Sequence, residues 1–134
     1  MTLTPTARFR QVCLDAADVG LVSLFWAQVL GREVELDPDG DARLRPGADG
    51  GPDLCILGVP EPKTVKNRLH LDVTLEVGQE ITDLLALGAS VVAEPDVKPW
   101  FVLADPEGNE FCAFPPDSEA SNDADAEVPA SVSL

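Results

Sequence analysis

Residues 69–77, LHLDVTLEV, alternate apolar and polar side chains without a break. Leucine and valine occupy one face, and the other face carries His70, Asp72, Thr74 and Glu76. A period of two is typical of a strand with one buried and one polar face. Residues 8–16, RFRQVCLDA, have the same form, with Phe9, Val12 and Leu14 opposite Gln11, Cys13 and Asp15. We therefore expect two equivalent strands, one early in the chain and one in its middle.

A helical pattern follows each of these strands. Residues 18–31, DVGLVSLFWAQVLG, begin with Asp18 as a helix N-cap, and residues 79–88, QEITDLLALG, form a shorter helix with acids in its first turn. Both end in Leu-Gly, where Gly31 and Gly88 favour a left-handed C-terminal cap. The residues expected to face inward are Leu21, Leu24, Phe25, Val29 and Leu30 in the first helix and Ile81, Leu84, Leu85 and Leu87 in the second.

The repeat continues to the last strand of each half. Cys55 follows Gly31 by 24 residues, and Cys112 follows Gly88 by the same 24. The strands expected after the helices are 32–36, 42–46 and 53–59 in the first half and 89–93, 99–104 and 110–114 in the second. The chain thus reads as an N-terminal extension (1–7), a first module (8–60), a linker (61–67), a second module (68–116) and an acidic tail (117–134). We expect this tail to be disordered, because it has almost no bulky apolar residues to bury.

The charge balance excludes several classes of partner. There are 9 basic and 24 acidic residues, a net charge of −15. Phosphate recognition depends on clustered lysine and arginine, so we expect no nucleic-acid partner and no anionic membrane partner. The N-terminal residues lack the apolar core of a secretory signal, and no apolar run is long enough to span a bilayer. The three cysteines have no Cys-x-x-Cys spacing. We expect a cytoplasmic protein with reduced thiols.

Two tandem βαβββ modules resemble the vicinal-oxygen-chelate superfamily, which includes glyoxalase I, extradiol dioxygenases and bleomycin resistance proteins. Three stretches resemble its glyoxalase-like members in particular: 25–34 (FWAQVLGREV), 60–73 (PEPKTVKNRLHLDV) and 100–114 (WFVLADPEGNEFCAF). The resemblance covers residues 8–116. It implies an α+β fold in which the two modules form a curved mixed sheet around a cleft, lined by the polar faces of the strands.

Metal-dependent relatives place a His or Gln ligand on the first strand of each module and a Glu ligand on the last. The resemblance maps the first-strand positions onto Gln11 and His70, and the last-strand positions onto Cys55 and Cys112. Both carboxylates are therefore missing, which disfavours a hard divalent ion. We expect no metal ion and no other cofactor, with Cys112 packing where relatives coordinate. The alternative is a soft metal such as zinc, held by Gln11, Cys55, His70 and Cys112.

His70 is the only histidine, and Asp72 follows it on the same face. Either this pair transfers protons as a general acid and base, or His70 is simply hydrogen-bonded within the cleft. Arg68 either neutralises an anionic ligand at the cleft mouth or pairs with surface acids. Trp100 is expected to form a cleft wall, whereas Trp26 is expected in the core or at an interface. The full set of expected cleft residues, besides the catalytic pair, is Gln11, Cys13, Cys55, Arg68, Trp100 and Cys112.

These expectations favour a metal-independent protein with a small-molecule cleft that acts as a lyase or isomerase of a small metabolite. The first alternative is a ligand-binding or sequestration protein of the bleomycin-resistance type, which holds its ligand without changing it. The second is a metal-dependent lyase or dioxygenase, which the missing glutamates oppose. A homodimer is the expected assembly.

Overall fold

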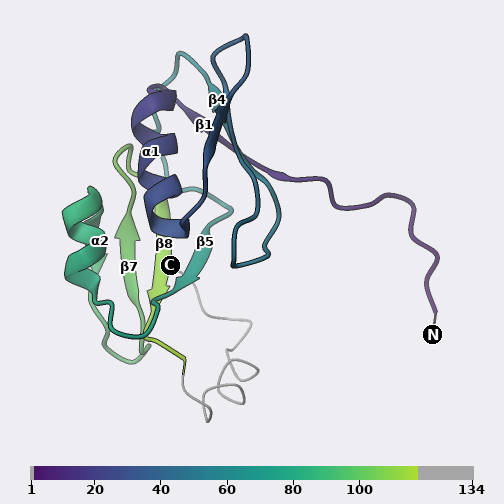
Figure 1. The fold of residues 1–134 in the computed structure, drawn as a ribbon. Helices are drawn as coiled ribbons and strands as arrows, with labels where there is room; N and C mark the ends of the chain where they lie inside the picture. Colours follow the sequence, from purple (N-terminus) through teal and green to yellow (C-terminus); the bar gives the residue numbers. More distant parts are fainter. Residues whose placement is uncertain (1, 118–134) are drawn as a thin grey trace. The chain divides into compact units, whose positions relative to one another are not determined.

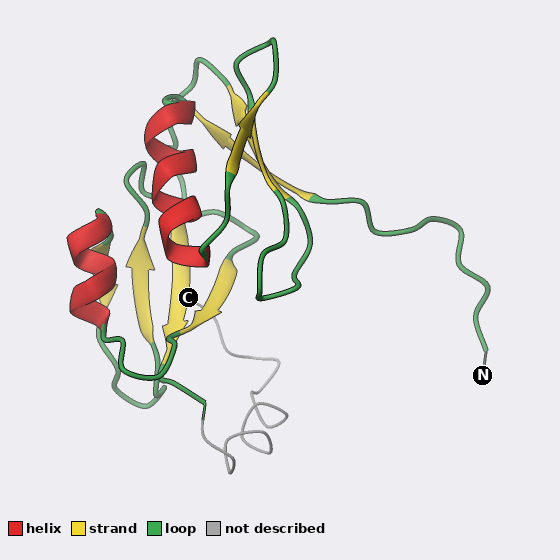
Figure 2. Ribbon diagram, viewed as in Figure 1, coloured by secondary structure: helices red, strands yellow, loops and turns green. Residues whose placement is uncertain are grey.

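The computed structural model describes residues 2–117, and the predicted acidic tail lies outside them except for Asp117. Contacts divide the chain into two compact units, Met1–Pro62 and Lys63–Leu134. Figures 1 and 2 show both units, which are described separately below. None of the described helices is long and apolar enough to cross a membrane.

The first unit contains one helix and four strands. In chain order these are β1 (Val12–Ala16), α1 (Val19–Leu30), β2 (Val34–Leu36), β3 (Ala42–Leu44) and β4 (Leu54–Gly58). The sheet order is β1-β4-β3-β2. Strands β1 and β4 run parallel, and the other neighbours are antiparallel.

The second unit repeats this arrangement. Its elements are β5 (Leu71–Thr74), α2 (Ile81–Leu87), β6 (Ser90–Ala93), β7 (Phe101–Ala104) and β8 (Glu110–Phe114). The sheet order is β5-β8-β7-β6, again with the first and last strands parallel. The predicted α+β fold of two βαβββ modules is confirmed, and each module forms its own four-stranded mixed sheet.

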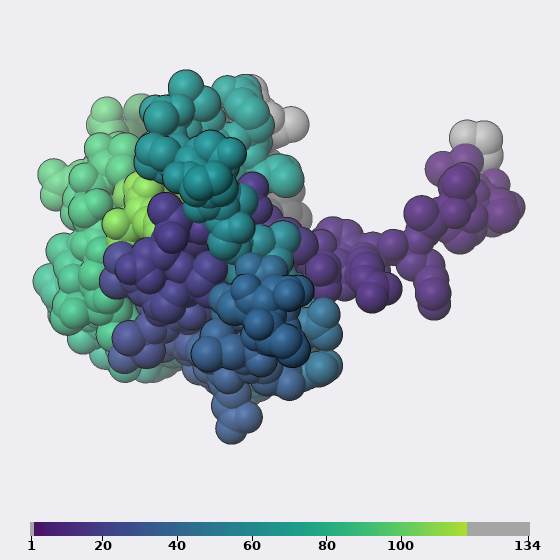
Figure 3. Space-filling view, turned by 90° about the horizontal axis from the view of Figure 1, so that it is seen from above, coloured from purple at the N-terminus to yellow at the C-terminus, as the bar shows by residue number. Residues whose placement is uncertain are grey.

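Both leading strands are shorter than predicted, because their partner strands are short. Strand β1 begins only at Val12, which pairs with Leu54; Pro52 has no N–H with which to extend the ladder. Phe9 is 75% exposed rather than buried. It lies in the extended segment before β1, drawn in purple in Figures 1 and 3.

The same limit applies to β5, where the predicted strand 69–77 is wrong at both ends. Strand β8 starts after a turn and is followed by Pro115 and Pro116. Its partner β5 therefore covers only Leu71–Thr74. Leu69 and Val77, both predicted to be buried, are 87% and 83% exposed.

Helix α1 begins and ends as predicted but buries a different face. The Asp18 side chain accepts a hydrogen bond from the Leu21 amide at 3.0 Å. Gly31, with φ of 65°, provides the left-handed cap. The helix packs on β3 and β4 through Val22, Ser23, Phe25, Trp26 and Ala27. Leu21 and Leu24 are 46% and 56% exposed, so their predicted burial is wrong.

The buried face of α1 is set by the large side chains. Trp26 and Phe25 are each 1% exposed and contact one another edge-to-face, with ring centroids 5.2 Å apart. Successive residues are about 100° apart around a helix axis. Leu24 lies two residues before Trp26 and therefore on the opposite side of the helix. Trp26 is therefore a core residue, as the sequence predicted.

Helix α2 is less deeply buried than predicted. Its first turn is closed by a hydrogen bond from the Glu80 amide to Asp83 Oδ2 at 2.8 Å, and Gly88 follows its last turn with φ of 125°. Leu84 is its one buried residue. Ile81, Leu85 and Leu87, also expected inward, are half-buried.

Candidate functional site

The register of the second sheet places four side chains in a row on one face. Asp72 on β5 pairs with Cys112 on β8, and Cys112 pairs with Val102 on β7. Ala93 on β6 pairs with Val102 in turn. Paired residues of neighbouring strands point to the same side of a sheet, so Asp72, Cys112, Val102 and Ala93 share a face. The opposite face carries the fully buried Leu103 and Phe111.

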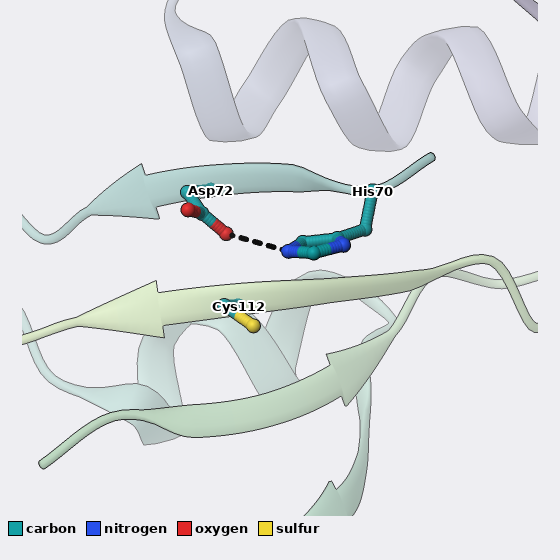
Figure 4. A group of neighbouring side chains, drawn as sticks. All are labelled: His70, Asp72 and Cys112. Atoms are coloured by element: carbon teal, nitrogen blue, oxygen red, sulfur yellow. Dashed lines mark ion pairs between the residues drawn. The ribbon is translucent and has the colours of Figure 1, made fainter. Parts of the chain in front are cut away.

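His70 lies immediately before β5 and completes a cluster with Asp72 and Cys112 (Figure 4). His70 Nε2 is 3.3 Å from Asp72 Oδ1, and the two side chains are 32% and 54% exposed. One ligand-type atom from each of the three residues lies within 4.8 Å of the others. The predicted pair of His70 and Asp72 is therefore in contact, although their backbone positions are about 6.5–7 Å apart along a strand.

The Cys112 thiol lies in an environment that keeps it protonated. The residue is 3% exposed. Burial raises its pKa to about 12, with further contributions from the negative charge of Asp72 and from a hydrogen bond to Asp72; Lys98 and Lys66 oppose these effects weakly. At neutral pH this thiol is therefore a hydrogen-bond donor to the Asp72 carboxylate rather than a thiolate nucleophile.

Trp100 is buried beside this cluster. It is 6% exposed and contacts Phe114 at a ring-centroid distance of 4.8 Å, in a group with Val102 and Cys112. Its Nε1 atom has no hydrogen-bond partner among the described residues. Trp100 also lines a cavity of about 260 Å³, together with Ala93, Glu94, Asp96, Val97, Lys98 and Val102. Since Val102 and Ala93 belong to the face of Cys112, this cavity opens on the same side of the sheet as the cluster.

A network of hydrogen bonds places β5 against β8. The Asp105 carboxylate accepts from the backbone amides of Glu107 and Asn109, and also from the Asn109 side chain. Asn109 Oδ1 accepts from Asn67 Nδ2 at 2.8 Å. The turn is thus tied to the segment that leads into His70.

Glu110 supplies a second tie to that segment. Its carboxylate accepts from Lys63 Nζ at 2.9 Å and from the Asn67 amide at 3.1 Å. Burial raises the pKa of Glu110, but the hydrogen bonds from Lys63 and Asn67 outweigh it, so the net pKa is lowered. Sequence reasoning recognised the stretches 60–73 and 100–114 separately and missed that they bind each other, since nothing local in either stretch shows its partner.

The first unit contains the equivalent positions with different residues. Cys13 on β1 pairs with Cys55 on β4, and Cys55 pairs with Arg43 on β3. Gln11 Nε2 donates to Cys13 Sγ at 3.4 Å, just as His70 contacts Asp72. Gln11 is half-buried, Cys13 is exposed and Cys55 is 4% exposed. The unit therefore carries a thiol and an amide where the second unit carries a carboxylate and an imidazole, and both units carry a cysteine on the last strand.

Arg68, predicted at the mouth of a cleft, is exposed. Arg68 forms no ion pair with another of the described residues. The cations that lower the pKa of Cys112 are Lys98 and Lys66. Lys98 was not singled out from the sequence, because its place beside the cluster depends on the pairing of β7 with β8.

The donor set does not fit a hard divalent ion of the kind that metal-dependent relatives hold. The last-strand position of the second unit is Cys112, which offers a soft sulfur where a hard ion prefers an oxygen ligand. His70 and Asp72 alone provide two donors. A thiophilic ion would first have to remove the Cys112 proton. No catalytic step is therefore assigned to a metal.

Comparison with known proteins agrees with the fold. The model of the glyoxalase-like domain family matches residues 11–114. No curated protein matches the chain significantly in sequence. Among solved structures, a glyoxalase/bleomycin resistance protein/dioxygenase family enzyme from Burkholderia phytofirmans PsJN is similar at a TM-score of 0.60 and 20% identity, covering 78% of this chain and 95% of that one.

Two further structures show the same likeness. A glyoxalase/bleomycin resistance protein from Albidiferax ferrireducens T118 has a TM-score of 0.58 and 20% identity, covering 81% of this chain and 98% of that one. The fosfomycin resistance protein FosX from Listeria monocytogenes has a TM-score of 0.63 and 15% identity, covering 86% and 98%. At these identities the likeness concerns the fold alone. The family match extends over most of the sequence, and the chain therefore belongs to the glyoxalase-like domain family.

Proposed function

We propose that this protein binds a small anionic metabolite and moves one of its protons without a metal ion, as a lyase or isomerase, with His70 as the base. The observation that carries the proposal is the contact of 3.3 Å between His70 Nε2 and Asp72 Oδ1, in a pair whose imidazole is still 32% exposed. A histidine oriented by a carboxylate and open to solvent is the usual arrangement of a general base.

The geometry suggests which nitrogen acts. When Nε2–H donates to Asp72, the other ring nitrogen, Nδ1, keeps its lone pair; Figure 4 shows it turned away from Asp72. Nδ1 would take a proton from a carbon next to a carbonyl group, and Asp72 would stabilise the imidazolium that forms. In an isomerisation the proton returns to the former carbonyl carbon, and the hydroxyl group of the enediol loses its proton to become the new carbonyl. In an elimination the leaving group departs with its bonding electrons from the other carbon next to the deprotonated one, and a C=C bond forms.

Two features support a ligand beside the dyad, and the first of them favours an anion. Lys66 and Lys98 exert positive fields at Cys112, in a chain of net charge −15. The cavity of about 260 Å³ next to Trp100 lies on the same sheet face, across β8 from His70. A ligand lying over β8 would place an apolar or planar part next to Trp100 and its reacting carbon near the imidazole of His70.

The test is proton exchange into heavy water, followed by proton NMR, with dihydroxyacetone phosphate and hydroxypyruvate as anionic α-hydroxycarbonyl probes. Each reaction is run without EDTA and again with EDTA, and the same result is expected in both. We expect loss of the C–H signal with the wild-type protein, none with His70→Gln, and wild-type exchange with Gln11→Ala, which alters the equivalent position of the first unit. Exchange that persists in His70→Gln, or that vanishes in wild type when EDTA is added and returns with Mn²⁺ or Zn²⁺, would refute the proposal.

A second candidate is binding without reaction, and the buried Trp100 Nε1 without a partner favours it. A ligand acceptor oxygen that reached this N–H would satisfy it. Under this alternative a probe changes the fluorescence of Trp100 with equal affinity in wild type and His70→Gln, and no exchange occurs in either. Trp26 also fluoresces, so both proteins are compared in a Trp26→Phe background.

A further inference from the structure

Cys13 and Cys55 are direct neighbours on the first sheet. They are paired positions of the parallel strands β1 and β4, so their side chains leave the sheet on the same side. Neighbouring strands lie about 4.7–4.9 Å apart, within the Cα separation of about 4.4–6.8 Å that disulfides span. Strand β1 is at the edge of its sheet, so an adjustment of its position on bond formation disturbs only one ladder.

The two thiols differ in access and in surroundings. Cys13 is exposed, and its sulfur accepts a hydrogen bond from Gln11 Nε2 at 3.4 Å. Cys55 is 4% exposed and has Arg43 as its neighbour on β3. A hydrogen bond with Cys55 raises the pKa of the Arg43 guanidinium, which stays charged next to the thiol. An exposed thiol beside a buried one, with a cation adjoining the pair, is typical of a peroxide-reactive site with its own resolving cysteine.

We propose that Cys13 and Cys55 form an oxidative modification site, in which hydrogen peroxide converts the two free thiols into an intrachain disulfide between β1 and β4. The Cys13 thiolate attacks one peroxide oxygen and the O–O bond breaks, giving the Cys13 sulfenic acid and a hydroxide that leaves as water after taking up a proton. The Cys55 sulfur then displaces the hydroxyl group, forming the S–S bond and releasing a second water. Two electrons pass from the two thiols to one peroxide. This inference does not depend on the proposed function of His70 and Asp72.

Cys112 provides a contrast within the same chain. It occupies the position of the second sheet that Cys55 occupies in the first, but its neighbour on the parallel strand is Asp72, not a cysteine. It is 3% exposed, and it has no thiol in register on either side, because Val102 is its other neighbour. The site therefore predicts one disulfide, with Cys112 left as a thiol.

The experiment treats the reduced full-length chain with hydrogen peroxide under native conditions and then alkylates it in denaturant. Mass spectrometry is expected to show a loss of about 2 Da from the intact chain, one alkylated cysteine in place of three, and a peptide in which Cys13 is joined to Cys55. Cys112→Ala is expected to oxidise at the wild-type rate within about twofold. Cys13→Ser is expected to remain fully reduced over the same period, because it lacks the exposed thiol.

Cys55→Ala separates the two chemical steps. It is expected to accumulate the Cys13 sulfenic acid, which dimedone traps, and to form no disulfide. The proposal is overturned if all three cysteines of the wild type remain alkylatable, if the disulfide joins Cys13 to Cys112 or to a second chain, or if dimedone labels Cys13 no faster in Cys55→Ala than in wild type. Oxidation in denaturant is the control; loss of the pairing preference there is expected, because the strand register is lost.

Discussion

The neutral state of Cys112 is the part of the site most open to direct measurement. The perturbation is Asp72→Asn, which keeps the size of the side chain and removes its charge. Burial is the largest cause of the raised pKa of Cys112, and Asp72 contributes through its charge and its hydrogen bond. We therefore expect the substitution to lower the pKa of the thiol without returning it to the ordinary value of 9.0.

The magnitude follows from the shift itself. The pKa rises from 9.0 to about 12, a difference of 12 − 9.0 = 3. At pH 8 the thiolate fraction falls from roughly 10% to roughly 0.01%, about a thousandfold. Because the unfolded chain releases this proton first, the folded state loses stability relative to the unfolded state as the pH rises. The loss, about 4 kcal/mol in total, begins near pH 9 and is complete only above about pH 12.

The assay is an alkaline titration of thiolate absorbance at about 240 nm, in a Cys13→Ser, Cys55→Ala background where Cys112 is the only cysteine. The chain contains no tyrosine, so no phenolate overlaps the signal. Circular dichroism at each pH identifies any unfolding. Burial of Cys112 would not raise its pKa if the thiol titrated near or below pH 9 in the folded protein. Asp72 would not raise it if the pKa were higher in Asp72→Asn than in the parent protein.

Three further predictions concern stability. Asn109→Ala removes the hydrogen bonds to Asp105 and Asn67 and should lower the free energy of unfolding, measured by urea titration, by about 2–3 kcal/mol. Asn67→Ala removes only one of these side-chain bonds and should lower it by about 1 kcal/mol. Equal losses in the two variants would contradict the network. Arg32, whose side chain is 3% exposed, pairs with Asp49 at 2.6 Å and lowers its pKa. Asp49→Asn should therefore lower the free energy of unfolding by about 1–2 kcal/mol at pH 7. The difference from wild type should shrink as the pH falls below about 4, because Asp49 itself becomes protonated. A difference that stays constant with pH would contradict the pairing. Gly31→Ala introduces a side chain at φ of 65° with open space around it, so backbone strain alone should cost about 1–2 kcal/mol by thermal unfolding.

Much of the fold followed from local patterns. The repeat of strand, helix and three strands was visible because alternation, N-caps and Leu-Gly helix ends are properties of neighbouring residues. The ends of β1 and β5 were not, since a strand extends only as far as its partner can pair. Proline residues in or beside those partners, Pro52 and Pro115, set limits that the sequence of β1 or β5 does not contain.

The site divides in the same way. The sequence by itself determined that the last-strand positions are Cys55 and Cys112 rather than glutamates, and that His70 and Asp72 share a face. Only the tertiary structure decided that Asp72 lies beside Cys112 and raises its pKa, and that Cys13 lies beside Cys55. Both pairings depend on the register of parallel strands about 40 residues apart, joined through a helix, and such a register is set by packing of the whole module rather than by any local pattern.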